Sequence, residues 1–380
     1  MNMNRREFLM ASTAYVLDPR RNPLEVPARE RGDYSFVVLG DIHFDGLTAS
    51  TYHAGYVPPS DPEKAKTYLD EFDRNAKMWK ARMPRLLNAA AGCVRPDTAF
   101  ALQLGDLVQG DCNSDAVHQK MMTDAFMTVK EAFGRRLPLY TTCGNHDIRQ
   151  AGGVSTSGAG PACYACMSRL LSAEEGLDVA ESAKLNYAFM RGPDLFIFAN
   201  FNLSASTELD FVRSSLSAHP EARYRFLVTH GPPIPSDTSN WSWGLCNSKT
   251  DSDSAQKPRR DLRALLLAND VIVLAGHVHT TELTEIATDE GRVTQVIASS
   301  VFSSEKLATN EPKHVGPAEY GIDQATDLGV RVLGEYRPAM TRYWRCSTAG
   351  YMRFEVNARG ITARVYGGDA DDPREVWRIR

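Results

Sequence analysis

The sequence predicts an α/β protein in which parallel β-strands alternate with crossover helices. Apolar runs of about four to eight residues recur along the chain, as expected for strands that are covered on both faces. Helix-like segments lie between several of these runs, and such alternation is typical of parallel sheets. Each run also leads into glycine and side chains that can bind metal. Because functional sites lie beyond the carboxyl ends of parallel strands, these side chains are predicted to share one sheet edge.

Five runs are predicted to be strands, and three segments between them are predicted to be helices. The strands cover Phe36–Leu39, Phe100–Leu104, Leu137–Thr142, Tyr224–Thr229 and Val271–Ala275. The helices cover Asp73–Ala91, Ala116–Phe133 and Arg259–Ala268. The glycines that follow the strands let the chain turn sharply and leave room for a ligand.

Residues 33–380 are predicted to form one domain with three loop insertions and a C-terminal hairpin. The insertions cover residues 45–72, 150–185 and 232–258, and the β-hairpin covers 350–366 around Ala358-Arg359-Gly360. Long loops beside a site often carry substrate recognition. In the third insertion, Trp241 and Trp243 either stack on an aromatic group of the substrate or fix the loop to the core. Both alternatives remain open.

The composition is that of a globular protein without a nucleic-acid or membrane signature. Of 380 residues, 43% are hydrophobic and 24% are charged, which is ample for a large core. A net charge of −4 argues against a basic nucleic-acid-binding face. No apolar stretch reaches the roughly 20 residues that cross a bilayer. The composition therefore indicates neither nucleic acid nor a membrane as the partner.

Residues 1–32 are interpreted as a leader and linker. Within it, Arg5-Arg6 precedes Phe8-Leu9 in a pattern that resembles a twin-arginine export signal. One alternative is export to the periplasm, and the other is a basic leader on a cytoplasmic protein. The paired arginines favour export.

The polar residues that follow the five strands form a set of metal-ligand types. They are Asp41, His43, Asp106, Asn145, His146, His230, His277 and His279. Carboxylates, an amide and imidazoles without thiolates suit Mn, Fe, Co, Ni or Zn, and their number suffices for two ions. One Asp-x-His or His-x-His alone would be weak evidence. Five such segments, each directly after an apolar run, are a strong joint signal.

Other histidines and cysteines carry no such pattern. His53, His118 and His219 are predicted to be solvated surface residues. Cys163 and Cys166 form a C-x-x-C pair without the second pair that a zinc site needs, so they are interpreted as a local disulfide or as two unused thiols.

The ordered motifs Asp-x-His, Gly-Asp, Gly-Asn-His-Asp, His and Gly-His-x-His resemble those of the calcineurin-like metallophosphoesterases. The resemblance covers roughly Tyr34–Phe302, and Leu185–Asn202 resembles a hairpin of the cyclic-nucleotide phosphodiesterase and purple acid phosphatase-like branch. It implies a sandwich of two facing mixed β-sheets flanked by helices. The chain has Gln109 where purple acid phosphatases carry a tyrosine ligand. The Asp and Arg of the protein phosphatase motif are also missing.

The resemblance also implies a role for each site residue. Asp41, His43 and His279 would hold the first metal ion, Asn145, His230 and His277 the second, and Asp106 would bridge the two. A hydroxide held by both ions would attack phosphorus. His146 would donate a proton to the leaving oxygen or stabilise its charge. Asp147 would orient His146 or, equally well, cap the turn.

The implied function is hydrolysis of phosphomonoesters or phosphodiesters by two first-row metal ions (Mn, Fe, Zn, Co or Ni). A nuclease of the same superfamily is one alternative, which the acidic composition disfavours. A non-catalytic scaffold that keeps the fold is another, although all seven ligand positions are filled.

Overall fold

The computed structural model describes residues 33–45, 50–55, 60–149, 160–236, 241–299, 313–322, 324 and 326–380. The predicted leader, residues 1–32, lies outside this part of the chain. Within the described ranges, no helix combines the length and the apolar character that crossing a membrane requires.

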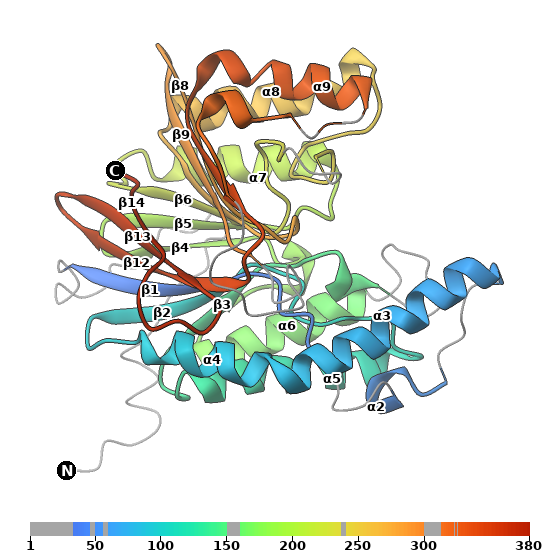
Figure 1. The fold of residues 1–380 in the computed structure, drawn as a ribbon. Coiled ribbons are helices and arrows are strands. Elements are labelled where there is room, and N and C mark those ends of the chain that lie inside the picture. The colour runs from blue at the N-terminus through green and yellow to red at the C-terminus, as the bar shows by residue number, and fades with distance from the viewer. Residues whose placement is uncertain are drawn as a thin grey trace.

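Two mixed β-sheets face each other, which confirms the predicted sandwich (Figure 1). The first sheet has the order β14-β13-β12-β1-β2-β3 and the second the order β10-β11-β8-β9-β7-β6-β5-β4. The first contains β1 (Tyr34–Leu39), β2 (Thr98–Gln103), β3 (Leu139–Thr141), β12 (Gly350–Asn357), β13 (Gly360–Gly367) and β14 (Glu375–Arg378). The second contains β4 (Tyr187–Arg191), β5 (Asp194–Ala199), β6 (Arg225–Thr229), β7 (Ile272–Ala275), β8 (Thr281–Thr288), β9 (Gly291–Ile297), β10 (Lys313–Val315) and β11 (Met340–Cys346).

Parallel strands form the part of each sheet that leads to the polar segments. In the first sheet β1, β2 and β3 are parallel, and in the second β5, β6, β7 and β9 are parallel. The hairpin β12–β13 pairs with β1 in antiparallel fashion and widens the first sheet. It spans the residues for which the sequence predicts a hairpin.

Helices cover the outer face of each sheet (Figure 1). The first sheet is covered by α4 (Met83–Gly92), α5 (Asp115–Ala132) and α6 (Gly160–Glu175), and the second by α7 (Ala205–Ala218), α8 (Asp253–Ala268) and α9 (Asp327–Gly334). The short α2 (Ser50–His53) and the long α3 (Pro62–Ala81) lie to one side, where α3 extends away from the sheets. Short 3₁₀ helices are η2 (His146–Ile148), η3 (Glu181–Ala183), η4 (Pro317–Glu319) and η5 (Arg337–Ala339).

All three predicted loop insertions contain helix, which corrects the sequence interpretation. In the first, α3 begins at Pro62 because the Asp61 carboxylate accepts hydrogen bonds from the N–H groups of Glu63 and Lys64. In the second lies α6, and in the third α8 begins one residue after its cap, Ser252. Capping side chains thus start helices inside segments whose composition is typical of loops.

Aromatic rings fill the space between the sheets. Phe36 of β1 meets Phe196 and Phe226 of the second sheet edge-to-face, with 5.7 Å between ring centroids in each pair. Phe100 of β2 meets Phe196 in the same way at 5.2 Å. Each of these fully buried rings contributes about 1.5–3 kcal/mol to stability. These strands are covered by the other sheet on one face and by helices on the other, which explains why their sequences are continuous apolar runs.

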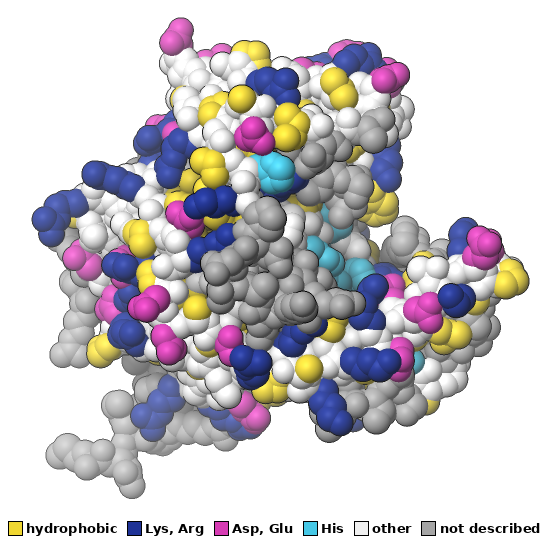
Figure 2. Space-filling model, in the orientation of Figure 1, with side chains coloured by type: hydrophobic (Ala, Val, Ile, Leu, Met, Phe, Trp, Pro, Cys, Tyr) yellow, Lys and Arg dark blue, Asp and Glu magenta, His cyan; other side chains and the backbone are white. Residues whose placement is uncertain are grey.

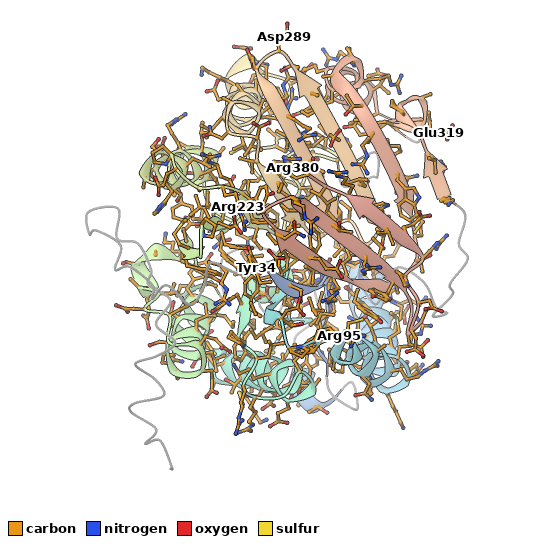
Figure 3. The ribbon with its side chains drawn as sticks, turned by 90° about the vertical axis from the view of Figure 1, so that its left-hand side faces the viewer. Tyr34, Arg95, Arg223, Asp289, Glu319 and Arg380 are labelled. Atoms are coloured by element: carbon orange, nitrogen blue, oxygen red, sulfur yellow. The ribbon has the colours of Figure 1, made fainter. Side chains whose placement is uncertain are left out.

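A buried carboxylate joins the two sheets at the end that lies away from the polar segments. Asp194 of β5 accepts a 2.9 Å hydrogen bond from the Tyr34 hydroxyl of β1 and two hydrogen bonds from Arg223. Tyr34 and Arg223 lie near each other in Figure 3. Asp194 is fully buried, so its charge depends on these partners.

We expect Asp194→Asn to lower the free energy of unfolding by about 3 kcal/mol, because Arg223 would lose the charge that it is paired with. Urea denaturation followed by circular dichroism would measure the change. The matched control is Asp210→Asn, which removes an exposed carboxylate paired with Arg213. That variant is expected to stay within about 0.5 kcal/mol of the parent. An equal loss in both variants would contradict a stabilising role for the buried group.

Candidate metal centre

The polar segments that follow five strands lie together at one edge of the sandwich. Asp41 and His43 follow β1, Asp106 follows β2, and Asn145 follows β3. His230 follows β6, while His277 and His279 follow β7. The first three strands belong to one sheet and the last two to the other, so the site lies between the sheets. Figure 2 shows histidine side chains in the recess above α3.

The backbone adopts a left-handed conformation at four of these residues. The φ angles are 46° at His43, 49° at Asp106, 72° at His277 and 55° at His279. This region is uncommon for residues with a Cβ atom, and such conformations concentrate at functional sites. Each therefore turns sharply at the strand end and points its side chain into the space between the sheets.

Two glycines allow the segments to approach each other closely. A Cβ atom on Gly144 would collide with Asp106, and one on Gly276 would collide with the Asp41 carboxylate. The main chain beside these glycines also holds the carboxylates. Asp106 Oδ1 accepts from the N–H of His146 at 2.7 Å, and Asp41 Oδ1 accepts from the N–H of His277 at 3.0 Å.

One cluster of possible metal ligands contains Asp41, His43, Asp106 and His279, whose ligand atoms all lie within 4.8 Å of one another. His279 Nε2 lies 3.0 Å from Asp41 Oδ2 and 3.2 Å from His43 Nε2. His43 Nε2 lies 3.7 Å from Asp106 Oδ2. Two imidazole nitrogens and two carboxylate oxygens that converge in this way suit a first-row cation.

A second cluster contains Asp106, His230 and His277. His230 Nε2 lies 3.2 Å from both Asp106 Oδ2 and His277 Nδ1. Asn145 Oδ1 and His277 Nε2 are buried without a hydrogen-bond partner among the described residues. Buried polar atoms normally have partners, so Asn145 Oδ1 fits a bound cation. On His277 it is Nδ1, 3.2 Å from His230 Nε2, that faces the cluster. Asp106 is the residue that the two clusters share.

The protonation states of most of these groups also suit metal binding. Burial lowers the pKa of His43 to about 4 and that of His277 to about 3, so both imidazoles are neutral and have a lone pair. Burial alone would raise the pKa of Asp106, but the imidazoles of His230 and His146 outweigh it and hold that pKa well below its usual value. The carboxylate is therefore ionised.

His230 differs from the other histidines. Burial acts to lower its pKa, but the carboxylates of Asp106 and Asp41 outweigh burial and raise the pKa to about 9. Its Nδ1 donates to the carbonyl oxygen of Leu104 at 2.8 Å, which leaves Nε2 facing Asp106. A cation between the two would replace the proton on Nε2, since metal binding releases protons from its ligands.

A hydrogen-bond network from α3 orients His43. Gln109 Oε1 lies 3.2 Å from His43 Nδ1 and also accepts from the side-chain amide of Asn75. Because an amide oxygen only accepts, Nδ1 of His43 carries the hydrogen. Nε2 is then the unprotonated nitrogen, and it faces His279 and Asp106. Gln109 Nε2 in turn donates to Glu71 Oε1 at 3.1 Å. The sequence showed Gln109 as a departure from a relative's tyrosine, but gave no signal for this network.

His146 lies beside the first cluster and contacts an arginine that the sequence interpretation did not single out. Its ring packs edge-on against His43, with centroids 4.4 Å apart, and its Nδ1 donates to the Gln109 carbonyl oxygen at 3.0 Å. Nη1 of Arg149 lies 2.9 Å from His146 Nε2. Burial and the charge of Arg149 hold the pKa of His146 well below its usual value. Arg149 stands three residues after His146, and that spacing was the available signal.

The carboxylate of Asp147 accepts hydrogen bonds from two backbone N–H groups. Gly144 donates to Oδ2 at 2.8 Å and Val108 donates to Oδ1 at 3.1 Å. These bonds correspond to the turn-capping alternative, and they tie the segment after β3 to the segment after β2. Burial and the nearby charge of Asp106 raise the pKa of Asp147 to about 7.

Several residues outside the metal motifs differ from their predicted surroundings. His53, His118 and His219 are buried rather than solvated. His53 bonds to Asp45 and stacks on Phe72. His118 Nε2 donates to the carbonyl oxygen of Asp147, whereas its Nδ1 has no hydrogen-bond partner among the described residues. Within α6, Cys163 lies 4.0 Å from Cys143, whereas Cys166 contacts Thr123; the two do not form a local disulfide.

Comparison with known proteins gives one family and several solved structures. The sequence model of the family described as calcineurin-like phosphoesterase matches residues 34–281. No curated protein sequence matches the chain. The chain is similar in fold to a structure of PhoD, with a TM-score of 0.52 and 10% identity over 93% of this chain and 70% of that one.

Two further solved structures are also similar. GAP50, described as the anchor in the inner membrane complex of Plasmodium, has a TM-score of 0.50 and 13% identity over 91% of this chain and 88% of that one. A putative 5'-nucleotidase from Staphylococcus aureus has a TM-score of 0.38 and 15% identity over 71% of this chain and 49% of that one. At these identities the first two similarities describe the fold alone.

Proposed function

The chain belongs to the calcineurin-like phosphoesterase family, and on that premise we propose that it hydrolyses small phosphate monoesters or diesters with two metal ions. The observation that carries the proposal is the position of Asp106 between two clusters of metal-ligand atoms. A shared carboxylate is the arrangement that a pair of neighbouring cations requires. Membership of the family by itself supports only metal-dependent phosphoester chemistry.

We assign the ligands as follows. Asp41, His43 and His279 would hold one ion, and Asn145, His230 and His277 would hold the other, with Asp106 common to both. When bound, the cations would supply positive charge that attracts phosphate oxygens and lowers the pKa of a nearby water molecule. The ligand set suits Mn, Fe, Zn, Co or Ni, and we favour Mn or a pair that contains Fe.

The surrounding side chains have separate tasks. Asn145 contacts the phosphate in addition to its metal, because its amide has a donor group as well as the unpartnered oxygen. His146 gives a proton to the leaving oxygen or stabilises its negative charge. An anionic substrate favours the protonated form of His146, opposing the effects of burial and of Arg149. Gln109 keeps His43 in the tautomer that can bind metal.

The paired arginines near the N-terminus motivate one further element of the proposal. We infer export to the periplasm through the twin-arginine route, since that route carries proteins that have already folded and bound their metals. A fusion of residues 1–32 to a reporter protein would show whether the segment directs export. Retention of the reporter in the cytoplasm would overturn this inference.

The proposed activity predicts that protein stripped of metal with a chelator is inactive and that first-row metal restores hydrolysis. A panel of p-nitrophenyl phosphate and bis-p-nitrophenyl phosphate, assayed with Mn, Fe, Co, Ni and Zn in turn, would measure this. Restored activity should rise with metal content to two ions per chain. Protein that binds two ions and cleaves neither ester would instead support a non-catalytic scaffold. Cleavage of oligonucleotides alone would support a nuclease.

A further inference from the structure

A cleft of about 440 Å³ opens beside the metal centre. Its lining includes the proposed metal ligand Asn145, Arg149 beside His146, Tyr68 from α3, and Asn202 and Trp243 from the second half of the chain. The Trp243 ring lies 6.3 Å from the ring of His277. A cleft of this size, next to His277 of the second metal cluster, has room for the alcohol part of a phosphate ester.

Two aromatic side chains line this cleft, one from each side of the site. Tyr68 is half-buried on α3 and lies under the guanidinium of Arg149, 5.2 Å from it. Trp243 is 42% exposed, which is unusual for a large aromatic side chain. The ammonium of Lys249 lies 4.6 Å from its ring and holds the ring in place through a cation–π contact.

The two tryptophans of this loop differ in exposure, so the exposure of Trp243 is not a property of the whole loop. Trp241 is only 6% exposed and packs into the core with Leu245 and Val332. It fixes the loop to the protein, which was one of the two roles predicted for the pair. Trp243, two residues later, makes no comparable contribution to the core and faces the cleft instead.

The positive charge of Arg149 in the cleft is compensated by two carboxylates. Arg149 Nη2 pairs with Asp111 Oδ2 at 2.6 Å, and Arg149 Nη1 lies 3.7 Å from Glu71 Oε1. The guanidinium is therefore already paired with two carboxylates, and the amides of Asn145 and Asn202 are uncharged. The buried cation of the cleft, Arg149, is therefore not available to pair with a second phosphate group. The two lysines near the cleft, Lys64 and Lys249, are exposed to solvent.

From the aromatic walls and the compensated charge we propose that the cleft binds a leaving alcohol that carries a planar, uncharged aromatic ring. This inference rests on the proposed phosphoesterase function and narrows its substrate class. The ring stacks on Trp243, Tyr68 lines the opposite side of the cleft, and the ester phosphate reaches Asn145 and the metal ligands. Trp243 is the main specificity-determining residue.

The test compares benzyl phosphate with n-butyl phosphate, whose leaving alcohols have similar acidity, so that chemistry alone does not favour the aromatic ester. If the parent enzyme cleaves only diesters, benzyl methyl phosphate and n-butyl methyl phosphate are compared instead. We expect kcat/KM to be about tenfold higher for the benzyl ester, the size of one stacking contact. Trp243→Leu should reduce that ratio to about two or less, while Trp243→Phe should keep most of it. Leu69→Ala, an exposed neighbour of Tyr68 outside the cleft lining, should leave rates and ratio unchanged.

Binding of benzylphosphonate and n-butylphosphonate, measured by calorimetry on the metal-loaded protein, tests the same preference without turnover. If neither ester is cleaved but benzylphosphonate binds about tenfold more tightly, the proposed function fails and the inference about the cleft stands. If both esters are cleaved at equal kcat/KM, or if Trp243→Leu keeps the preference, the inference is overturned and the function stands. A preference for an alcohol with a second phosphate would also overturn it.

Discussion

Replacing Asp106 with asparagine is expected to lower kcat/KM for phosphate ester hydrolysis at least about 1,000-fold. The carboxylate belongs to both ligand clusters, and asparagine offers one oxygen in place of two. That oxygen can still accept the 2.7 Å hydrogen bond from the His146 N–H, whereas the NH₂ group would face His230 Nε2. Two cations then lose their common ligand. A loss of about 4 kcal/mol of charge stabilisation corresponds to this fall in rate.

The metal content of the variant should distinguish loss of the shared ligand from a general loss of folding. Mass spectrometry of the metal-loaded Asp106→Asn protein is expected to find at most one ion per chain, compared with two in the parent. The matched control is Asp194→Asn, because Asp194 is equally buried but joins the sheets at the opposite end. That variant should be less stable and yet bind two ions. An Asp106→Asn protein with two ions and more than a tenth of the parental activity would contradict the shared-ligand assignment.

His146→Gln should lower kcat about 100- to 10,000-fold on an alkyl phosphate ester, the range of general acid catalysis. His146 belongs to neither ligand cluster, so metal content should not change. The loss should be less than about tenfold for p-nitrophenyl phosphate, because its acidic leaving group needs little help from a proton donor. Kinetic constants for the two esters therefore measure the role of His146 directly.

A suitable control for this variant is His219→Gln. His219 is also buried, but it pairs with Glu221 at the end of α7, and its replacement should leave both esters unaffected. An equal loss on both esters would exclude proton donation to the leaving oxygen. A loss of metal would place His146 among the ligands.

The strand ends were predictable from the sequence because their signal is local. Each apolar run and the ligand after it are neighbours in the chain, and the carboxyl ends of parallel strands meet at one edge. Asp41 and Asp106 could therefore be placed near each other without coordinates. His277 follows a strand of the second sheet, and it reaches them because the two sheets face each other. The two-sheet arrangement came from the family resemblance, since periodicity does not distinguish one sheet from two.

The partners of these residues were not predictable, because tertiary packing brings them together. Glu71 and Asn75 reach Gln109 from α3, a helix whose first turns lie in a segment that looked like a loop. The buried histidines were missed for the same reason. His53 looks polar and isolated in the sequence, but its partners Asp45 and Phe72 are supplied by other segments.

The left-handed residues of the candidate metal centre tie its geometry to the rest of the fold. Such backbone conformations cost of order 1–3 kcal/mol each and persist only where the rest of the fold enforces them. At His43, Asp106, His277 and His279 the fold sets these φ angles. Hydrogen bonds from the N–H groups of His146 and His277 hold the Asp106 and Asp41 carboxylates beside them. Little rearrangement then opposes ion capture, and preorganised sites gain affinity in this way. The rigidity of the sandwich is thus converted into affinity for metal.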